Sequence, residues 1–588
     1  MRTFEEIKHT IESGLGKSPC SLRLENVQLV NTFSGEIYPT CIHIQGKRIV
    51  SIDPDVRLEA RAVIDGGGQY AIPGLIDSHM HFETTMLSPE ALAGVVVPKG
   101  TTTLCADLME IANVAGEDGI RAMLQGAANL PYRLLIEVSS RVPTAPGLET
   151  TGAVLDAQAV ARIMDWEQSI SLGELDPSKI LLVQEEYIHK IADALQRRKI
   201  VNGHAIGRLG QELNIYASAG ISDDHECVTA EELVARLRAG MRVLVREGST
   251  ERNLDSLIKG AIEANVPIEN LCFCTDDKHP NEIYREGHIN YNVRRAIELG
   301  LTPMEAISIG SINAARHFRM DDELGSITPG RLADIVLVPD LKAVEPSLVM
   351  FEGSVVAENG ALKTPVPVPS YPGWLLDTVH LKREITAQSF QVPAGGAVQE
   401  VHAAVIELIP SQIINRRLTC RLPVVDGLVQ SDPGRDVLKL AVVERYGKTG
   451  SVGVGFVKGF HLLRGALAFT TSHDHHNIVA VGVSDEDIAA AVNDLVQMHG
   501  GATVVCGGAV TAHMPLRIGG LMSELSAEET AAALETLNQA AAGLGYPYPA
   551  PFMTLSFISL PTVPELGLTD LGLVDVLQHK LIPVIEQS

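Results

Sequence analysis

The sequence predicts an α/β protein whose largest part is a (β/α)8 barrel, with a small composite β-sandwich domain and a C-terminal α+β domain. Strand-like apolar runs alternate with helical patterns between residues 73 and 330, which indicates a parallel sheet and, at this length, a closed barrel. Histidines and carboxylates follow most of these runs, at the strand ends where a barrel carries its active site. The 588 residues are also too many for a single core.

The amino-terminal segment predicts short strands. Apolar or alternating runs at Ser21–Val30 and Arg48–Ile52 stand between turn residues. A further apolar run, Gly330–Val338, predicts a strand that can return to them. We therefore expect residues 1–72 with 331–361 to form one composite β-sandwich.

Residues 73–330 supply the predicted barrel. The runs that predict its buried strands are Thr101–Ala106, Leu134–Val138, Ser169–Leu172, Val201–Gly203, Arg242–Val245 and Leu271–Thr275. The stretches that predict helices are Ala157–Asp165, Ile180–Gln196, Ala230–Ala239 and Thr302–Phe318.

The remainder of the chain predicts a separate domain. Residues 361–373 hold prolines at 365, 367, 369 and 372, a composition typical of a linker. Residues 374–588 follow as an α+β domain, and Ala527–Leu544 is its clearest helix because Ala and Leu recur there at helical spacing.

Composition restricts the partners. The formal net charge of −25 argues against nucleic acid, whose phosphates need a basic surface, although it allows a small neutral base. The amino terminus lacks the apolar core of a secretory signal, and no apolar run is long enough to span a bilayer. The 8 cysteines form no disulfide framework in a chain of this length. We expect a cytoplasmic protein with reduced thiols, no nucleic-acid partner and no membrane association.

The strongest local motif is Asp77-Ser78-His79-Met80-His81, preceded by Ile72-Pro73-Gly74-Leu75-Ile76. Alternate side chains of a strand point the same way, so His79 and His81 can bind one metal ion at the strand end. A lone His-x-His is weak, but the preceding strand delivers this pair to the active face of a barrel.

Further candidate ligands appear in order along the chain, most of them after a strand-like run. They are Glu174, His204, His225 and Asp276. Imidazoles and carboxylates without thiolates suit zinc, iron(II) or manganese. We expect His79, His81 and Asp276 to hold one ion, His204 and His225 a second, and Glu174 to bridge the two. Two such ions about 3.5–4 Å apart can share a hydroxide.

The chain resembles the amidohydrolase superfamily and, more narrowly, the adenine deaminases, from its first strands almost to its last residue. The residues that carry the resemblance are 73–81, Glu110-Ile111-Ala112-Asn113-Val114, residues 219–226, Thr275-Asp276-Asp277 and, in the tail, His473-Asp474-His475-His476-Asn477-Ile478, Gly519-Gly520-Leu521-Met522-Ser523 and residues 551–557. The tail motifs matter most, because generic amidohydrolases lack that domain.

The resemblance implies hydrolysis of adenine to hypoxanthine and ammonia, with two iron or manganese ions as cofactors; zinc stays open. It implies a bridging glutamate, for which Glu174 fits better than Glu185, since Glu185 lies in a predicted helix. Asp276 would move the proton to the departing nitrogen, and His225 would bind metal and polarise the reacting centre. Glu110 would donate to N1 or contact the base edge, or else form a salt bridge near the barrel rim.

The tail cluster His473–Asn477 is interpreted in two ways. It forms a lid over the barrel mouth, where His473, Asp474 and His476 contact substrate, or it is a solvent-exposed turn. Two departures from the family pattern bear on substrate choice: Leu108-Met109 replaces Pro-His, and Leu175-Asp176-Pro177 replaces Met-Met-Asn.

Three functions are compatible with this sequence. The first is an adenine deaminase or a hydrolase of another 6-substituted purine. The second is a superfamily member that opens a cyclic amide, which predicts a bridging lysine and no long tail. The third is a decayed paralogue that binds purine without turnover. A homo-oligomer is expected from base rates alone.

Overall fold

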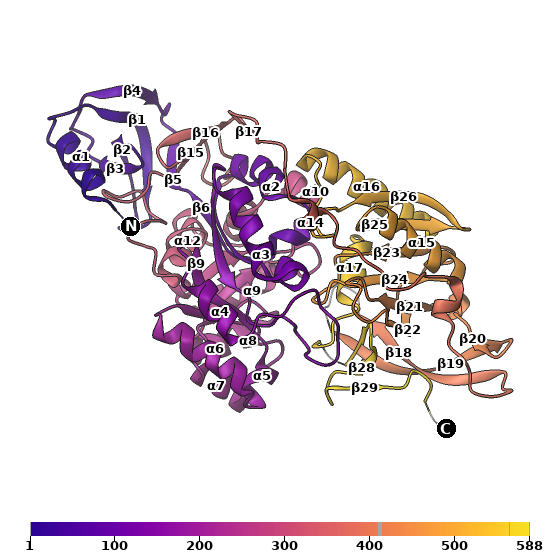
Figure 1. Cartoon of the computed structure of the whole chain (residues 1–588). Helices are drawn as coiled ribbons and strands as arrows, with labels where there is room; N and C mark the ends of the chain where they lie inside the picture. The colour runs from indigo at the N-terminus through magenta and orange to yellow at the C-terminus, as the bar shows by residue number, and fades with distance from the viewer. Residues whose placement is uncertain (1, 410–413, 564, 587–588) are drawn as a thin grey trace.

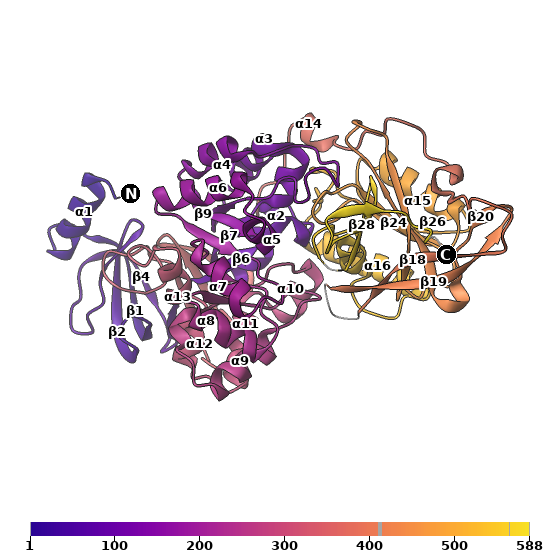
Figure 2. The same cartoon turned by 90° about the horizontal axis from the view of Figure 1, so that it is seen from below.

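The computed structural model describes residues 2–409, 414–563 and 565–586. Its three parts lie in a row, with the amino-terminal sheet and the C-terminal domain on opposite sides of the central barrel units (Figures 1 and 2). No helix among the described residues is long and apolar enough to cross a membrane.

The amino-terminal part is one mixed sheet, built from the chain segments that precede and follow the barrel. Its strands are β1 (Cys20–Asn31), β2 (Glu36–Gln45), β3 (Arg48–Ser51), β4 (Ala60–Asp65), β5 (Tyr70–Pro73), β14 (Ile335–Val338), β15 (Leu348–Phe351), β16 (Ser354–Glu358) and β17 (Ala361–Leu362). β14 pairs antiparallel with β5, so the chain returns to this sheet after leaving the barrel. Helix α1 (Phe4–Gly14) precedes it.

Among the described residues, eight strands form the parallel centre. Five of them make one sheet, β6 (Leu75–Met80), β7 (Thr101–Asp107), β8 (Arg133–Val138), β9 (Ser169–Leu175) and β10 (Ile200–Gly203), and three make another, β11 (Asp223–Asp224), β12 (Arg242–Arg246) and β13 (Leu271–Cys274). The two arcs meet through a few backbone hydrogen bonds. Ser222 N donates to Val201 O at 2.8 Å at one junction; at the other, Asp276 N donates to His79 O and His81 N donates to Asp276 O, both at 3.1 Å. The ring is therefore closed by isolated bonds rather than by a continuous ladder.

Helices cover the outside of these strands. They are α2 (Pro89–Val96), α3 (Met109–Ala127), α4 (Ala157–Met164), α5 (Pro177–Leu181), α6 (Glu185–Gln196), α7 (Gly210–Ser218), α8 (Ala230–Arg238), α9 (Leu254–Glu263), α10 (Pro280–Glu286), α11 (Ile289–Glu298), α12 (Pro303–Ile309) and α13 (Ile312–His317). Two predicted helices were wrong in extent. The stretch Ile180–Gln196 is divided by Val183, which has a φ of 54°, and Thr302–Phe318 is divided at Gly310.

The C-terminal domain is a sheet of nine described strands covered on both faces. Its strands are β18 (Glu400–Leu408), β19 (Asn415–Val425), β20 (Leu428–Val429), β21 (Val437–Val443), β22 (Val452–Lys458), β23 (Ala466–Phe469), β24 (Ile478–Gly482), β25 (Gly501–Cys506) and β26 (Ala509–Pro515). Alternate residues of β21 face two cores: Leu440 packs with α16 (Ala527–Leu544), and Ala441 packs with α15 (Asp485–Gln497). The predicted helix over Ala527–Leu544 is confirmed.

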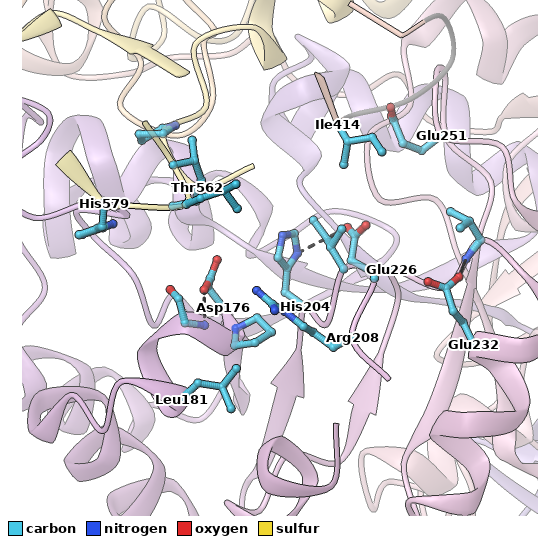
Figure 3. Close-up of a pocket in the computed structure, with 18 of the residues that line it drawn as sticks. Asp176, Leu181, His204, Arg208, Glu226, Glu232, Glu251, Ile414, Thr562 and His579 are labelled. Carbon is cyan, nitrogen blue, oxygen red and sulfur yellow. Dashed lines mark hydrogen bonds and ion pairs between the residues drawn. The ribbon is translucent and has the colours of Figure 1, made fainter. Parts of the chain in front are cut away.

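Shorter elements complete this domain next to the barrel mouth. They are α14 (Gly373–Leu376), α17 (Pro551–Phe557) and the small sheet of β27 (Leu566–Thr569), β28 (Gly572–Asp575) and β29 (Lys580–Ile582). The segment between α17 and β27 and the turn between β28 and β29 face the barrel loops (Figure 3).

Candidate functional site

Two histidines at the end of β6 begin the site. His79 is fully buried and His81 is 4% exposed, because the strand runs into the closed barrel mouth. Their Nε2 atoms lie 3.5 and 3.8 Å from Asp276 Oδ1, respectively. Asp276 follows β13, and its positive φ of 57° turns the chain directly after the strand. The first and last strands of the ring thus deliver three donors to one point.

Glu174 lies at the centre of the remaining donors. Its Oε2 atom is 3.1 Å from His204 Nδ1 and 3.0 Å from His225 Nε2. Gly173, which precedes it, is required by space, because a Cβ there would lie 2.1 Å from an Asp107 carboxylate oxygen. Glu185, the weaker candidate for the bridge, is exposed in the first turn of α6 and belongs to none of the donor groups found among the described residues.

The six predicted ligands form overlapping groups of three. In each group the donor atoms lie within 4.8 Å of one another: His79, His225 and Asp276; His79, His81 and Glu174; and Glu174, His204 and His225. All six residues are buried. His79, His225 and Glu174 each belong to two of the groups, and of these Glu174 alone, as a carboxylate, has two oxygens with which to contact two ions.

The donor chemistry fits divalent metal ions. His79 Nε2 is buried and has no hydrogen-bond partner in the part of the chain described, while His79 Nδ1 lies 2.8 Å from Glu137 Oε2. A carboxylate behind one imidazole nitrogen orients the other toward a metal ion. Cys272 and Cys274 belong instead to the apolar barrel core, and the donor groups found among the described residues contain no cysteine.

Two opposing effects set the pKa values in this cluster: burial disfavours the charged forms, and close opposite charges favour them. Burial lowers the pKa of His79, but Glu137 and Asp276 raise it to about 10. Burial also raises the pKa of Asp276, but His79 and Arg246 hold it well below its ordinary value. Without a cation, His79 therefore retains a proton, and that proton must leave when metal binds.

Two buried arginines support the carboxylates. Arg246, at the end of β12, donates through Nη1 to Asp276 Oδ2 at 2.9 Å and to Glu226 Oε1 at 2.7 Å. Arg141 follows β8 and donates to Glu174 Oε1. Sequence reasoning missed both arginines, as well as Glu137 and Glu226. The one feature of the sequence that could have revealed these four residues is their position, since each lies in or shortly after a strand of the ring.

Glu110 lies behind the donor cluster. It is fully buried in the first turn of α3, with Oε2 3.3 Å from His81 Nδ1 and Oε1 3.4 Å from His473 Nδ1. It is not among the residues that line the cavity in the described structure. The structure brings Glu110 to two imidazoles rather than to the cavity surface.

The tail cluster closes the cavity and is not a solvent-exposed turn, because all residues from His473 to Asn477 are buried. His473 and Asp474 line the cavity. Asp474 Oδ2 accepts a hydrogen bond from Thr144 at 2.8 Å and lies 3.7 Å from Arg141 Nη1. The predicted contact His476 lies behind, with its ring 5.8 Å from that of His473, and is absent from the described cavity wall.

The two departures from the family pattern lie at different distances from the donors. Met109 lines the metal cavity, so its thioether occupies the wall that a histidine would otherwise provide. Asp176 lines a larger outer pocket instead (Figure 3). There its Oδ1 accepts from Ser178 N at 2.6 Å and caps α5.

Comparison with known proteins covers nearly the whole chain. The sequence profile of the amidohydrolase family matches residues 70–356, and that of the adenine deaminase C-terminal domain matches residues 412–580. An adenine deaminase of Desulforamulus reducens is 53% identical over 97% of both chains. Adenine deaminase 2 of Carboxydothermus hydrogenoformans is 41% identical over 99% of this chain and 100% of its own. An adenine deaminase of Moorella thermoacetica is 40% identical, with 99% and 98% covered.

Proposed function

The chain belongs to the adenine deaminase family, a group of amidohydrolases, and on that premise we propose that it hydrolyses adenine to hypoxanthine and ammonia. The observation that carries the proposal is a buried set of four imidazoles and two carboxylates from the ends of five strands of one ring, closed over by a tail that matches the adenine deaminase C-terminal domain. Water supplies the oxygen that replaces the amino group at C6, and the amino group leaves as ammonia.

We propose that His79, His81 and Asp276 hold one divalent ion, that His204 and His225 hold a second, and that Glu174 bridges the two. The overlap of the three donor groups supports two adjoining sites. Nitrogen and oxygen donors suit manganese and iron(II), and zinc stays open. A bound divalent ion lowers the pKa of water and supplies a nucleophile at neutral pH.

Asp276 is the residue proposed to move the proton. Its Oδ2 atom is held by Arg246, which leaves Oδ1 facing the imidazoles of His79 and His81. Oδ1 would take a proton from the attacking water and give it to the exocyclic nitrogen, because ammonia must leave protonated. Such proton transfer contributes roughly 10²–10⁴-fold to a rate. His225 would polarise the reacting centre.

The tail residues His473 and Asp474 are proposed to contact the base. His473 stacks on Phe557, with ring centroids 4.8 Å apart at 14°, and burial lowers the pKa of His473 while Asp474 and Glu110 raise it to about 10. A protonated imidazole can donate to a ring nitrogen of the purine. Glu110 would orient His81 and His473 rather than touch the base, and His476 would support His473 from behind.

The competing functions make different demands on the chain. A hydrolase of cyclic amides predicts a bridging lysine and no long tail, whereas Glu174 lies at the centre and the tail matches a deaminase domain. A decayed paralogue predicts missing ligands, whereas all six meet. A cytoplasmic location and a homo-oligomeric state stay predictions.

The experiment is an ammonia-release assay on manganese-loaded protein, with adenine beside a panel of cyclic amides. Ammonia and hypoxanthine should appear in equal amounts from adenine alone. The H225A variant, with its metal content measured, serves as the inactive control. Metal-loaded protein that releases ammonia only from a cyclic amide, or from nothing, would overturn the proposal.

A further inference from the structure

The metal cavity is too small to admit a purine from solvent as it stands. Its volume is about 30 Å³, whereas pockets that hold small molecules measure roughly 300–1,000 Å³. Met109, Phe557, Leu560 and Val563 close it on the apolar side. A substrate must therefore arrive through an adjoining space.

An outer pocket of about 650 Å³ adjoins this cavity. Figure 3 shows Asp176, Leu181, His204 and Arg208 on the barrel side, with Thr562 and His579 facing them from the C-terminal domain. Four residues line both spaces: His204, Glu226, Arg246 and Thr562. His204 is itself one of the donors, Arg246 donates to Asp276, and Glu226 Oε1 lies 3.3 Å from His225 Nε2.

A short segment of the C-terminal domain forms the partition between the two spaces. Leu560 and Val563 line the metal cavity, Pro561 lines the outer pocket, and Thr562 lines both. The Thr562 hydroxyl is buried and has no hydrogen-bond partner within the described ranges. A passing base can supply that partner.

The walls of the outer pocket suit a flat, neutral, partly apolar ligand. Leu182 and Leu577 are 64% and 74% exposed there, so apolar surface is left uncovered at its edge. The carboxylates of Asp176, Glu226, Glu232 and Glu251 outnumber the guanidinium groups of Arg208 and Arg246. An excess of negative charge repels a phosphorylated purine and tolerates a neutral base.

We propose that the outer pocket is the docking site for free purine bases and the route by which they reach the metal cavity past Thr562. The proposal rests on the proposed deamination of adenine for its substrate class. It places the first encounter between the barrel loops and the C-terminal domain, where His204 is the one proposed metal ligand on the described pocket wall. The carboxylates of the outer pocket would exclude nucleotides, because they repel the phosphate group.

The binding test uses L577W and the product hypoxanthine, which does not turn over, on manganese-loaded protein. Leu577 is exposed, so the exchange should not disturb folding. Stacking of a purine on the new indole should quench its fluorescence saturably, and AMP at equal concentration should not. I188W, a 41% exposed position on α6 away from both spaces, is the matched control. Equal quenching in the two variants, or equal quenching by AMP, would overturn the proposal.

The kinetic test uses the double variant L182W/L577W, in which two tryptophans constrict the entrance of the outer pocket. Diffusion of adenine through a crowded entrance should slow, so kcat/KM should fall by about tenfold or more while bound manganese stays unchanged. I188W should keep the kcat/KM of the unaltered protein. A double variant with unchanged kcat/KM refutes the route. Failure of the unaltered protein to deaminate adenine would instead refute the proposed function, and the hypoxanthine titration would still decide the docking site.

Discussion

Replacing Arg141 by methionine should destabilise the metal-free protein far more than the metal-loaded protein. Arg141 is 3% exposed, donates to Glu174 and lies 3.7 Å from Asp474. Methionine has a side chain of comparable shape but no charge. The exchange therefore removes the cation and leaves the buried carboxylates of Glu174 and Asp474 with weaker partners. A bound divalent ion neutralises Glu174 in its place, which should offset much of the loss.

The magnitude follows from the burial of this pair. Removing one partner of a buried ion pair costs about 3–5 kcal/mol. In a domain of 150–250 residues, 1 kcal/mol corresponds to about 2–4 °C in melting temperature, so metal-free R141M should melt roughly 6–20 °C lower. Burial lowers the pKa of Arg141, but Asp474 and Asp176 raise it, so the guanidinium stays charged throughout the working pH range.

The assay is thermal unfolding followed by circular dichroism, with and without manganese. Arg162 provides the control, because its side chain is 61% exposed and lies 3.4 Å from Glu117; R162M should cost at most about 1 kcal/mol. Equal melting temperatures for R141M and R162M without metal would refute the reasoning. So would a loss that manganese leaves undiminished, because the cation would then not share the role of Arg141.

Other perturbations follow from the same structure. Removing metal with a chelator should abolish ammonia release and manganese should restore it, at two ions per chain by elemental analysis; D276N should lower kcat by roughly 10²–10⁴-fold in the same assay. Burial raises the pKa of Glu149 from 4.5 to about 7, so the folded state keeps a proton that the unfolded state loses, and stability falls as pH rises from 4.5 to 7. E149Q should remove this fall, worth up to about 3 kcal/mol, in melts at pH 5 and pH 8. Leu537 is fully buried on the core-facing side of α16, and L537A should cost about 2–5 kcal/mol in the same melts.

The donors of the site could be predicted because strands repeat every two residues and a barrel collects strand ends. His79 and His81 share one side of a strand, and Glu174 ends another, so local pattern and fold class together brought them to one place. The helix over Ala527–Leu544 was equally readable, since Ser526 and Glu529 form a capping box at its start.

The sequence did not reveal ion pairs between residues that are far apart in the chain. Arg141 pairs with Glu174, which is 33 residues away, and with Asp474 in another domain; nothing near Arg141 distinguishes it from a surface arginine. The break of the predicted helix at Val183 was also hidden, because its left-handed backbone is unusual for a β-branched residue. The position of His476 outside the cavity wall was hidden as well, because it goes with a left-handed backbone at His476 itself, where φ is 49°.

The C-terminal domain is part of the metal site and not only a cover over it. Asp474 faces Arg141 at 3.7 Å, His473 Nδ1 lies 3.7 Å from Asp474 and 3.4 Å from Glu110, and Glu110 lies 3.3 Å from His81. Because Arg141 also binds Glu174, an unbroken series of ionic contacts joins the ligand on β9 to the ligand after β6 through the tail. If the tail were absent, Arg141 and Glu110 would each lose one of their two charged partners. The positions of the proposed metal ligands therefore depend on a domain that supplies none of those six residues.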